Sequence, residues 1–332
     1  MSNNNCKDCI FQPIGNGQAA CAGCNIKSAE EPFFNEAPNP KHVVWMGASG
    51  CSIVAEAIYP FTSMRNNGVH PIFETTGGAL TGMQAAYEWQ RSQGLITEDD
   101  IRFVAFAGDG ATADIGAGSL SGWLDRGDPG MIWVCYDNNH YANTGTQRSG
   151  TTPIGTFTTT TPHGFSTSPN AQGKDLIKFA AAHPALAYAA HTTISRNWPY
   201  DLEEKARAAH DHAMEGPVFV HVITPCPRGW SYAADRGREI GDIGIDTGAI
   251  PLYHVVKVGL GHLWYLDFLP ERYEEFWNGG EIRKDIHPVE EWLLSQGRFN
   301  DILKNPAEVA AYQERLDFKW RELKKICEPY GS

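Results

Sequence analysis

The sequence lacks an excess of positive charge, which excludes one large class of partners. Its 332 residues include 27 Lys and Arg against 39 Asp and Glu, for a formal net charge of -12. A surface of this kind repels the phosphates of nucleic acids, and no stripe rich in Lys and Arg interrupts the acidic balance. We therefore expect a protein that does not bind nucleic acid.

Long apolar runs are also missing. The longest ones have the length of a strand, whereas a membrane helix needs about 20 residues. The polar start MSNNNCKDC does not have the pattern of a signal peptide. We therefore predict a cytoplasmic protein with no membrane segment. Its 42% hydrophobic content suffices for a full core, and its length suits one large domain or two small ones.

Short apolar runs alternate with helical spacings from residue 42 onward. The predicted strands are a short run that starts at 42, His70–Thr75, Phe103–Ala107, Met131–Tyr136, Ala187–Ile194 and Val218–Thr224. The predicted helices are Ile53–Tyr59, Gly77–Arg91, Asp175–Ala182, Leu202–Met214 and stretches near 288–295 and 306–327. This alternation is typical of a parallel sheet covered by helices on both faces. We therefore predict an α/β fold with a doubly wound, mostly parallel sheet.

The composition changes along the chain and suggests three segments. Residues 1–40 are rich in Asn, Pro, Gly and Cys without a sustained period, so we predict an irregular, Cys-rich arm. Residues 41–230 carry the strand and helix pattern and form the predicted α/β domain. Within it, residues 145–174 are rich in Thr, Ser, Gly and Pro, and we interpret them as a lid or a subunit-contact loop. Residues 231–332 form a predicted C-terminal extension with helices that contact other subunits.

Two polar turns follow successive predicted strands between residues 102 and 145. Gly108-Asp109-Gly110 ends the first strand and Asp137-Asn138-Asn139 ends the second. The carboxyl ends of parallel strands meet at one edge of a sheet, where ligands bind. Glycine lets the main chain come close to phosphate oxygens, and the N–H groups at the start of a helix bind the anion. Asp and Asn side-chain oxygens are suitable ligands for a hard cation. The two turns therefore predict a metal-bridged diphosphate site, and ordinary turn roles for the same residues are the alternative.

The sequence has eight cysteines, and two metal sites are consistent with their spacing. In a reducing compartment such residues are more typical of ligands or buried side chains than of disulfides. In the first assignment the two CxxC pairs of the arm form a closed zinc site, from Cys6, Cys9, Cys21 and Cys24. In the second, one pair joins two cysteines that follow predicted strands to hold an iron–sulfur cluster, from Cys21, Cys24, Cys51 and Cys226. Cys135 and Cys327 are expected to be buried as small hydrophobic residues.

Several longer motifs, taken together, resemble one known family. In chain order they are Cys21-Ala22-Gly23-Cys24, Gly50-Cys51-Ser52, GDGATADIG at 108–116, YDNNHYANTGTQRS at 136–149, PCPRGW at 225–230, TGAIPLY at 247–253 and HPVEEWLLSQGRF at 287–299. This combination resembles the beta subunit of the 2-oxoacid:ferredoxin oxidoreductases, most of all the pyruvate:ferredoxin oxidoreductase (pyruvate synthase) branch. The motifs extend over nearly the whole chain.

The resemblance implies that the domain is a thiamine diphosphate-binding PP module with one 4Fe-4S cluster beside it. The implied cluster ligands are Cys21, Cys24, Cys51 and Cys226. The implied Mg²⁺ ligands are Asp109, Asn138 and the main-chain carbonyl of His140. The remaining implied cofactor contacts are Gly50, Ser52, Gly108, Gly110, Ala111, Asn143 and Thr144. Two residues are expected to act in catalysis: Asn143 beside the thiazolium and substrate, and Cys51 by setting the cluster close to the thiazolium.

The resemblance also implies a reaction and a set of partners. The reaction is the reversible oxidative decarboxylation of a 2-oxoacid, pyruvate in the first place, with coenzyme A to acyl-CoA, CO2 and reduced ferredoxin. The partners are alpha, gamma and delta subunits of one complex. The glutamate that activates thiamine is expected on the alpha chain, with Glu74 as a local alternative. A non-catalytic zinc-knuckle assembly subunit and a cluster-free thiamine diphosphate decarboxylase or synthase are the alternative functions.

Overall fold

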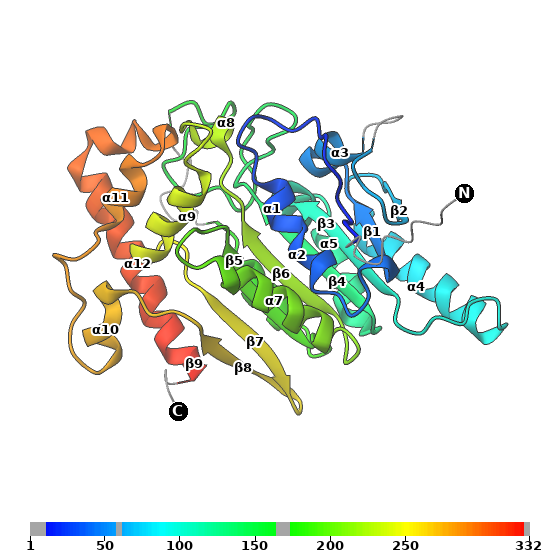
Figure 1. The fold of residues 1–332 in the computed structure, drawn as a ribbon. Helices are drawn as coiled ribbons and strands as arrows, with labels where there is room; N and C mark the ends of the chain where they lie inside the picture. Colours follow the sequence, from blue (N-terminus) through cyan, green and yellow to red (C-terminus); the bar gives the residue numbers. More distant parts are fainter. Residues whose placement is uncertain (1–10, 58–61, 164–172, 329–332) are drawn as a thin grey trace, which may run out of the picture.

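The computed structural model describes residues 11–57, 62–163 and 173–328 and is built on one sheet (Figure 1). The sheet has nine strands in the order β2-β1-β3-β4-β6-β5-β7-β8-β9. Their bounds are β1 Val43–Gly47, β2 Gly68–Val69, β3 Arg102–Gly108, β4 Met131–Asp137, β5 Tyr188–Thr193, β6 Val218–Ile223, β7 Tyr253–Val258, β8 Gly261–Leu266 and β9 Cys327–Glu328. Among these nine described strands, the pairs β5–β7 and β7–β8 are antiparallel and the other neighbours are parallel. The predicted mostly parallel sheet is therefore confirmed.

Helices cover both faces of this sheet (Figure 1). Their bounds are α1 Ile26–Glu30, α2 Pro32–Asn35, α3 Cys51–Glu56, α4 Thr76–Ser92, α5 Ala117–Arg126, α6 Leu176–Ala181, α7 Pro199–His212, α8 Pro227–Trp230, α9 Gly237–Asp246, α10 Glu271–Trp277, α11 Val289–Leu294 and α12 Pro306–Ile326. Four short turns of other helical types cover Pro40–His42, Gly110–Asp114, Gly297–Phe299 and Ile302–Lys304.

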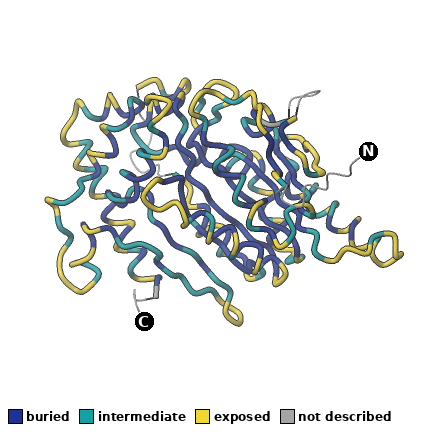
Figure 2. Tube along the Cα trace, in the orientation of Figure 1, coloured by how far each residue is buried: buried dark blue, intermediate teal, exposed yellow. Residues whose placement is uncertain are grey.

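Strand β3 shows why the sheet is covered by helices on both faces, so that the protein has three layers. Because side chains alternate along a strand, Phe103 and Ala105 face one core with α4, α5 and α6, whereas Val104 and Phe106 face a second core with α2 and α7. Both cores are closed to solvent along the central strands, which are dark in Figure 2. A strand that is apolar on both faces is typical of a parallel sheet covered on both sides.

The register of the sheet places the two polar turns side by side. Gly108 at the end of β3 pairs with Tyr136 near the end of β4, so Asp109 and Asp137 leave neighbouring strands together. In the order β1-β3-β4-β6 these four strands are adjacent and parallel. The loops that follow all four therefore emerge at one edge of the sheet.

Several predicted elements differ from the observed ones. Residues 70–75, predicted as a strand, form turns, and the strand is only Gly68–Val69. The predicted helix Ile53–Tyr59 begins earlier, at Cys51, and α3 ends at Glu56; residues 58–61 lie outside the described part. The arm was expected to be irregular but contains α1 and α2.

Buried aromatic residues explain the helices of the arm. Phe33 and Phe34 of α2 are fully buried, and Phe34 packs on Phe106 of β3 with ring centroids 5.5 Å apart.

The hairpin of β7 and β8 was not anticipated either. It lies in the segment 231–332, where only helices were expected, and it joins the same sheet through β5.

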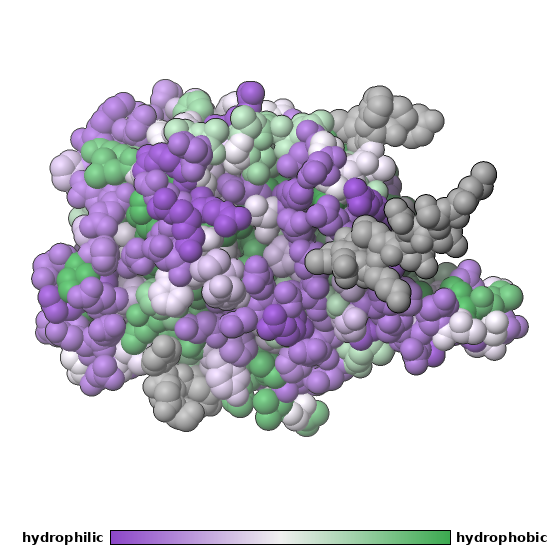
Figure 3. Space-filling view, in the orientation of Figure 1, coloured by the Kyte–Doolittle hydropathy of each residue, from purple (hydrophilic) through white to green (hydrophobic). Residues whose placement is uncertain are grey.

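The surface agrees with the polar composition. The face shown in Figure 3 is mostly hydrophilic, with scattered hydrophobic patches. Among the described residues no helix combines the length and the apolar character that crossing a membrane requires.

Helices α4 and α5 approach each other at a glycine, and this contact makes a first prediction. A Cβ atom on Gly77 would lie 2.2 Å from the main-chain oxygen of Ser119, whereas a Cβ atom on Gly78 would meet nothing within 4 Å. We expect Gly77→Ala to lower the free energy of unfolding by about 1–3 kcal/mol because the helices must separate. Gly78→Ala is the matched control and should raise it by about 0.4–1 kcal/mol. Urea denaturation of both variants measures the difference, and equal effects would contradict the observed contact.

Candidate active site

A cavity of about 150 Å³ opens at the carboxyl ends of β1, β3 and β4. Ten of the residues implicated by the sequence line it, namely Gly50, Cys51, Gly108, Asp109, Gly110, Ala111, Asn138, His140, Asn143 and Thr144. Ser52 does not line the cavity; it is buried, and its N–H donates to the hydroxyl of Tyr136 at 3.3 Å. The structure thus brings together segments that are up to 94 residues apart, from Gly50 to Thr144.

Three oxygen-bearing groups of the cavity converge on one point. One terminal atom of the Asn138 amide lies 3.3 Å from Oδ1 of Asp109 and 2.6 Å from the main-chain oxygen of His140. If the amide nitrogen occupies this position, it donates to both oxygens. If the amide oxygen occupies it, three oxygens face one another without a proton between them, which is the environment of a hard cation. Rotation of the amide by half a turn therefore converts a hydrogen-bonded cluster into three oxygens that face one another.

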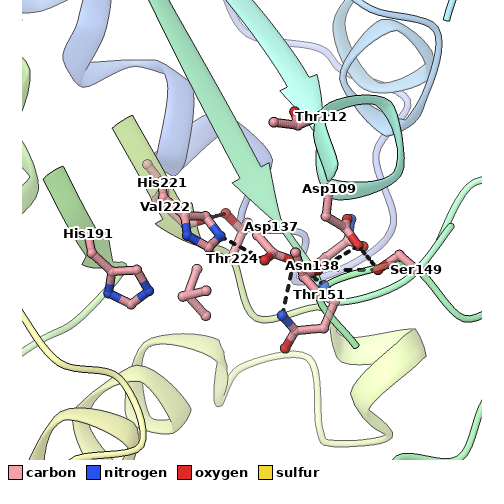
Figure 4. Close-up of polar contacts among 12 residues, drawn as sticks. Asp109, Thr112, Asp137, Asn138, Ser149, Thr151, His191, His221, Val222 and Thr224 are labelled. Atoms are coloured by element: carbon pink, nitrogen blue, oxygen red, sulfur yellow. Dashed lines mark hydrogen bonds and ion pairs between the residues drawn. The ribbon is translucent and has the colours of Figure 1, made fainter. Parts of the chain in front are cut away.

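Asp109 is a buried carboxyl group, and among the residues that the structure describes no cationic side chain lies within 4.0 Å of it. Its Oδ2 accepts hydrogen bonds from the hydroxyl groups of Ser149 and Thr151, while Oδ1 faces Asn138 (Figure 4). Burial raises the pKa of Asp109 well above its usual range, and the charge of Asp137 raises it further, although the two hydroxyl groups oppose the rise. A bound divalent cation would supply the missing positive charge. The chemistry of these donors therefore fits Mg²⁺.

Asp137 has a different partner and a different role. Its Oδ2 lies 2.7 Å from Nε2 of His221, and its Oδ1 accepts from Thr151 at 2.9 Å and from the N–H of Asn139 at 2.6 Å. Burial alone would raise the pKa of Asp137, but these donors outweigh it, and the pKa lies below its usual range. The hydroxyl of Thr151 contacts both carboxyl groups and so links the pair Asp137–His221 to Asp109 (Figure 4).

Sequence reasoning missed several residues of this network. Ser149 and Thr151 lie in the Thr- and Ser-rich loop, whose composition carried no signal for a contact with Asp109. The loop contacts the site at these two residues, and its part 164–172 lies outside the described residues. His221 is a buried histidine with a carboxylate partner, and nothing in the residues around it in the sequence indicated that contact.

Aromatic side chains form one wall of the cavity. Phe73, Tyr136 and Tyr141 line it, and the rings of Phe73 and Tyr141 lie 5.9 Å apart. Gly110 leaves room for Tyr141, because a Cβ atom there would lie 2.4 Å from its ring. Glu74, the local alternative for the activating glutamate, is exposed and does not line the cavity. The structure therefore does not favour Glu74.

The four implied cluster ligands form one electrostatic group next to the cavity. Burial raises the pKa of Cys51 to about 12, and the next contributions come from Cys226, Cys24 and Cys21. Burial likewise raises the pKa of Cys24 to about 11, again with contributions from Cys226 and Cys21. Thiols that raise one another's pKa lie near one another. Cys51 also lines the cavity, so this group adjoins the Asp109 site.

Contacts between the arm and the loop after β6 hold the cysteines together. The N–H of Cys24 donates to the carbonyl of Cys21 at 3.0 Å, which closes the CxxC turn. Next to it, the side chain of Asn25 donates to the carbonyl of Pro225 at 2.8 Å. Gly23 lies against the backbone of Ala234, where a Cβ atom would come within 2.0 Å of its oxygen. These contacts join the arm to the loop that carries Cys226.

Four thiols are the donor set of an iron–sulfur cluster, so the residues present fit that group. Within residues 11–57, 62–163 and 173–328, no three or more His, Cys, Asp or Glu side chains are grouped so that they could hold a metal ion. A four-iron cluster is wider than one ion, so its four thiolate ligands need not meet at one point. Cys6 and Cys9, the other half of the predicted zinc alternative, lie outside the described residues. Cys135 and Cys327 are buried, as predicted.

The chain is similar to known proteins over most of its length. Residues 47–222 match the family described as "Thiamine pyrophosphate enzyme, C-terminal TPP binding domain". The chain is 34% identical to "Pyruvate synthase subunit PorB" of Pyrococcus horikoshii, with 92% of both chains covered. It is 34% identical to the subunit of the same name from Thermotoga maritima, over 93% of this chain and 90% of that one. It is 33% identical to "Ketoisovalerate oxidoreductase subunit VorB" of Pyrococcus furiosus, over 95% and 93%.

A solved structure has the same fold. The 2-oxoglutarate:ferredoxin oxidoreductase from Magnetococcus marinus superposes with a TM-score of 0.50 at 22% identity, over 65% of this chain and 68% of that one.

Proposed function

The chain belongs to the family of 2-oxoacid:ferredoxin oxidoreductase beta subunits, and from this membership we propose that it holds the diphosphate end of thiamine diphosphate and one 4Fe-4S cluster. The enzyme of which it is a subunit oxidises a 2-oxoacid. Thiamine diphosphate, when bound, supplies the carbon nucleophile for the 2-oxo group, and the cluster supplies an acceptor for single electrons. The chain's own residues supply position and charge.

One observation supports the cofactor assignment above all others: the convergence of Asp109, Asn138 and the His140 carbonyl at the edge of the sheet. These oxygens would hold Mg²⁺, which would neutralise the diphosphate against the Gly108 and Gly110 backbone. Burial, with the nearby charge of Arg298, lowers the pKa of His140 to about 3, so its imidazole is neutral at pH 7. His140 would therefore offer its main-chain carbonyl to Mg²⁺, and its neutral imidazole would add no positive charge beside the ion.

The cavity is also suited to orient the reacting end of the cofactor. Asn143 and Thr144 are exposed lining residues that offer hydrogen-bonding groups to a substrate, and Phe73 and Tyr141 add apolar ring surface to the same lining. Cys51 lines the same cavity as Asp109, so a cluster bound to Cys51 would stand next to the cofactor. A short separation matters because electron transfer weakens steeply with distance. We propose that Asn143 orients the substrate and that Cys51 shortens the electron path.

We further propose pyruvate as the substrate, coenzyme A as the acyl acceptor and ferredoxin as the electron acceptor. Relatives named for pyruvate and for ketoisovalerate match at nearly equal identity, 34% and 33%. The small, aromatic-walled cavity favours a short apolar side chain. The activating glutamate and the remaining substrate contacts would come from an alpha-type subunit, with gamma- and delta-type subunits completing the complex in the cytoplasm.

Metal and cofactor analysis of the anaerobically purified complex tests this function. We expect thiamine, magnesium, iron and sulfide to co-purify with it, and pyruvate to be turned over faster than ketoisovalerate or 2-oxoglutarate in the presence of coenzyme A and ferredoxin. Zinc without iron or thiamine would instead identify a zinc-knuckle assembly subunit. Thiamine without iron or sulfide in this chain would identify a cluster-free thiamine enzyme.

A further inference from the structure

Arg298 is a buried cation without a carboxylate partner. Its side chain is 1% exposed, and in the described part of the chain no Asp or Glu oxygen lies within 4.0 Å of it. One of its terminal nitrogens, Nη2, is buried without any hydrogen-bond partner. Burying a charge is costly unless an opposite charge compensates it. The position therefore needs an explanation.

Arg272 shows the usual solution in the same protein. It is also 1% exposed, but its Nε lies 3.6 Å from Oδ1 of Asp317, and its Nη1 donates to the carbonyls of Lys284 and Ile286 at 3.3 and 3.0 Å. The carboxylate of Asp317 compensates the Arg272 charge. In the described part of the chain Arg298 has no carboxylate within 4.0 Å, and Asp137 acts on it only from farther away.

Aromatic rings and neutral amides hold Arg298 in place instead. The guanidinium lies 3.7 Å from the ring centroid of Trp230 and 4.9 Å from that of Phe299. Its Nε donates to Oε1 of Gln296 at 2.8 Å, and Nη1 donates to Oδ1 of Asn139 at 3.2 Å. Cation–π contacts and amide oxygens orient the charge without neutralising it. Asp137 also stabilises the charged form of Arg298, but in the described part of the chain no carboxylate lies within 4.0 Å of the guanidinium to pair with it directly.

Both proposed cofactor sites adjoin this charge. Arg298 stacks on Trp230, the last residue of α8, and Cys226 is the N-cap of the same helix. The indole N–H of Trp230 donates to the carbonyl of Asn138 at 2.7 Å. The charge of Arg298 lowers the pKa of Cys226 and that of His140, so both residues lie within its electrostatic range. Gly229 of this loop also packs directly on the His140 ring, where a Cβ atom would lie 2.0 Å from it.

We propose that Arg298 is the counter-cation of the cluster held by Cys226 and that it raises the reduction potential of that cluster. This inference rests on the proposed function. Reduction adds one electron to the cluster and changes no bond, so the reduced form carries one more negative charge. A fixed positive charge in a low-dielectric surrounding stabilises the reduced form more than the oxidised one, because the potential depends on the net charge around the cluster. Arg298 is thus a positioning and charge-setting residue that does not touch the substrate.

A redox titration of the anaerobically purified complex, followed by EPR, tests the proposal. The signal of this cluster is the one that the Cys226→Ser complex lacks. In Arg298→Gln we expect its midpoint potential to fall, with the reduction equilibrium shifted about tenfold toward the oxidised form, which is 59 mV for a one-electron couple. Arg298→Lys keeps the charge and should stay close to the wild-type potential. Arg272→Gln removes an equally buried arginine elsewhere and should leave the potential unchanged.

A second variant covers the case in which Arg298→Gln does not accumulate. Gln296→Glu is nearly isosteric and places a carboxylate on the Nε of Arg298, which neutralises the charge while the stacking on Trp230 is kept. We expect its midpoint potential to fall as well. An unchanged potential in either assembled variant, or an equal fall in Arg272→Gln, would overturn the proposal. A wild-type complex without iron in this chain would instead refute the proposed function.

Discussion

Replacing Asp109 with asparagine is expected to abolish thiamine diphosphate-dependent turnover, with a loss of at least about 100-fold. Removing a residue that hydrogen-bonds to a metal ligand typically lowers metal affinity or activity 10–100-fold. Asp109 is proposed as a direct ligand, so we expect at least that loss. Asparagine keeps the side-chain shape and an oxygen for the hydroxyl groups of Ser149 and Thr151. It removes the only charge among the three converging oxygen groups. Thiamine content of the purified complex and 2-oxoacid oxidation measure the effect.

The same substitution should not weaken the fold. Burial and the charge of Asp137 already disfavour the charged form of Asp109 and raise its pKa. A neutral amide therefore relieves repulsion in the protein without cofactor, and its melting temperature should not fall. Asp242→Asn is the control, because Asp242 is another buried carboxyl group that binds Ser195 and Arg196 away from the cavity. Thiamine binding that survives in Asp109→Asn, or that is lost equally in Asp242→Asn, would refute the proposed cation site.

Cys226→Ser is expected to remove the cluster while the protein stays folded. The sulfur of Cys226 accepts a hydrogen bond from the N–H of Gly229 at 3.4 Å and so caps helix α8. Serine is a good capping residue, so the loop should keep its conformation, but its hydroxyl is a poor ligand for iron compared with a thiolate. We expect this chain's iron and sulfide to be lost and ferredoxin reduction to fall by about 100-fold or more, comparable with losses on removing a residue essential to a metal site.

Thiamine binding separates this result from general damage. Because Cys226 does not line the cavity around Asp109, the Cys226→Ser complex should still bind thiamine diphosphate. Cys327→Ser is the control: Cys327 is buried at the far edge of the sheet in β9 and should retain full iron content. If Cys226→Ser retains iron and Cys327→Ser loses it, the assignment of the cluster ligands is wrong.

Much of the architecture followed from local patterns in the sequence. The strands β3, β4, β5 and β6 were predicted within one or two residues, because each is a short apolar run bounded by turn residues. The predicted strand at residues 70–75 failed for a tertiary reason. Phe73 does not enter the sheet but packs on Tyr141 at the cavity wall. The hairpin of β7 and β8 was missed because many of its residues are only partly buried and give a weak alternating signal.

Some residues of the candidate site could likewise be recognised from local sequence patterns, and others could not. The turn around Asp109 and the turn around Asn138 could be recognised because glycine, aspartate and asparagine at the ends of strands have local physical meanings. Arg298 carried no such signal. An arginine in a late surface-like motif gives no indication that it will be buried on Trp230, 68 positions earlier.

The sequence by itself determined the fold class, the two polar turns and the candidate thiols, because strand periodicity and turn chemistry act over a few neighbouring residues. Only the tertiary structure decided which of these groups meet. It joined Cys21 and Cys24 to Cys226 through Asn25 and placed Thr151 between Asp109 and Asp137. It also left Nη2 of Arg298 without a hydrogen-bond partner among the described residues. Such contacts depend on strand register and on the packing of distant loops, and the cost of a buried charge depends on everything around it.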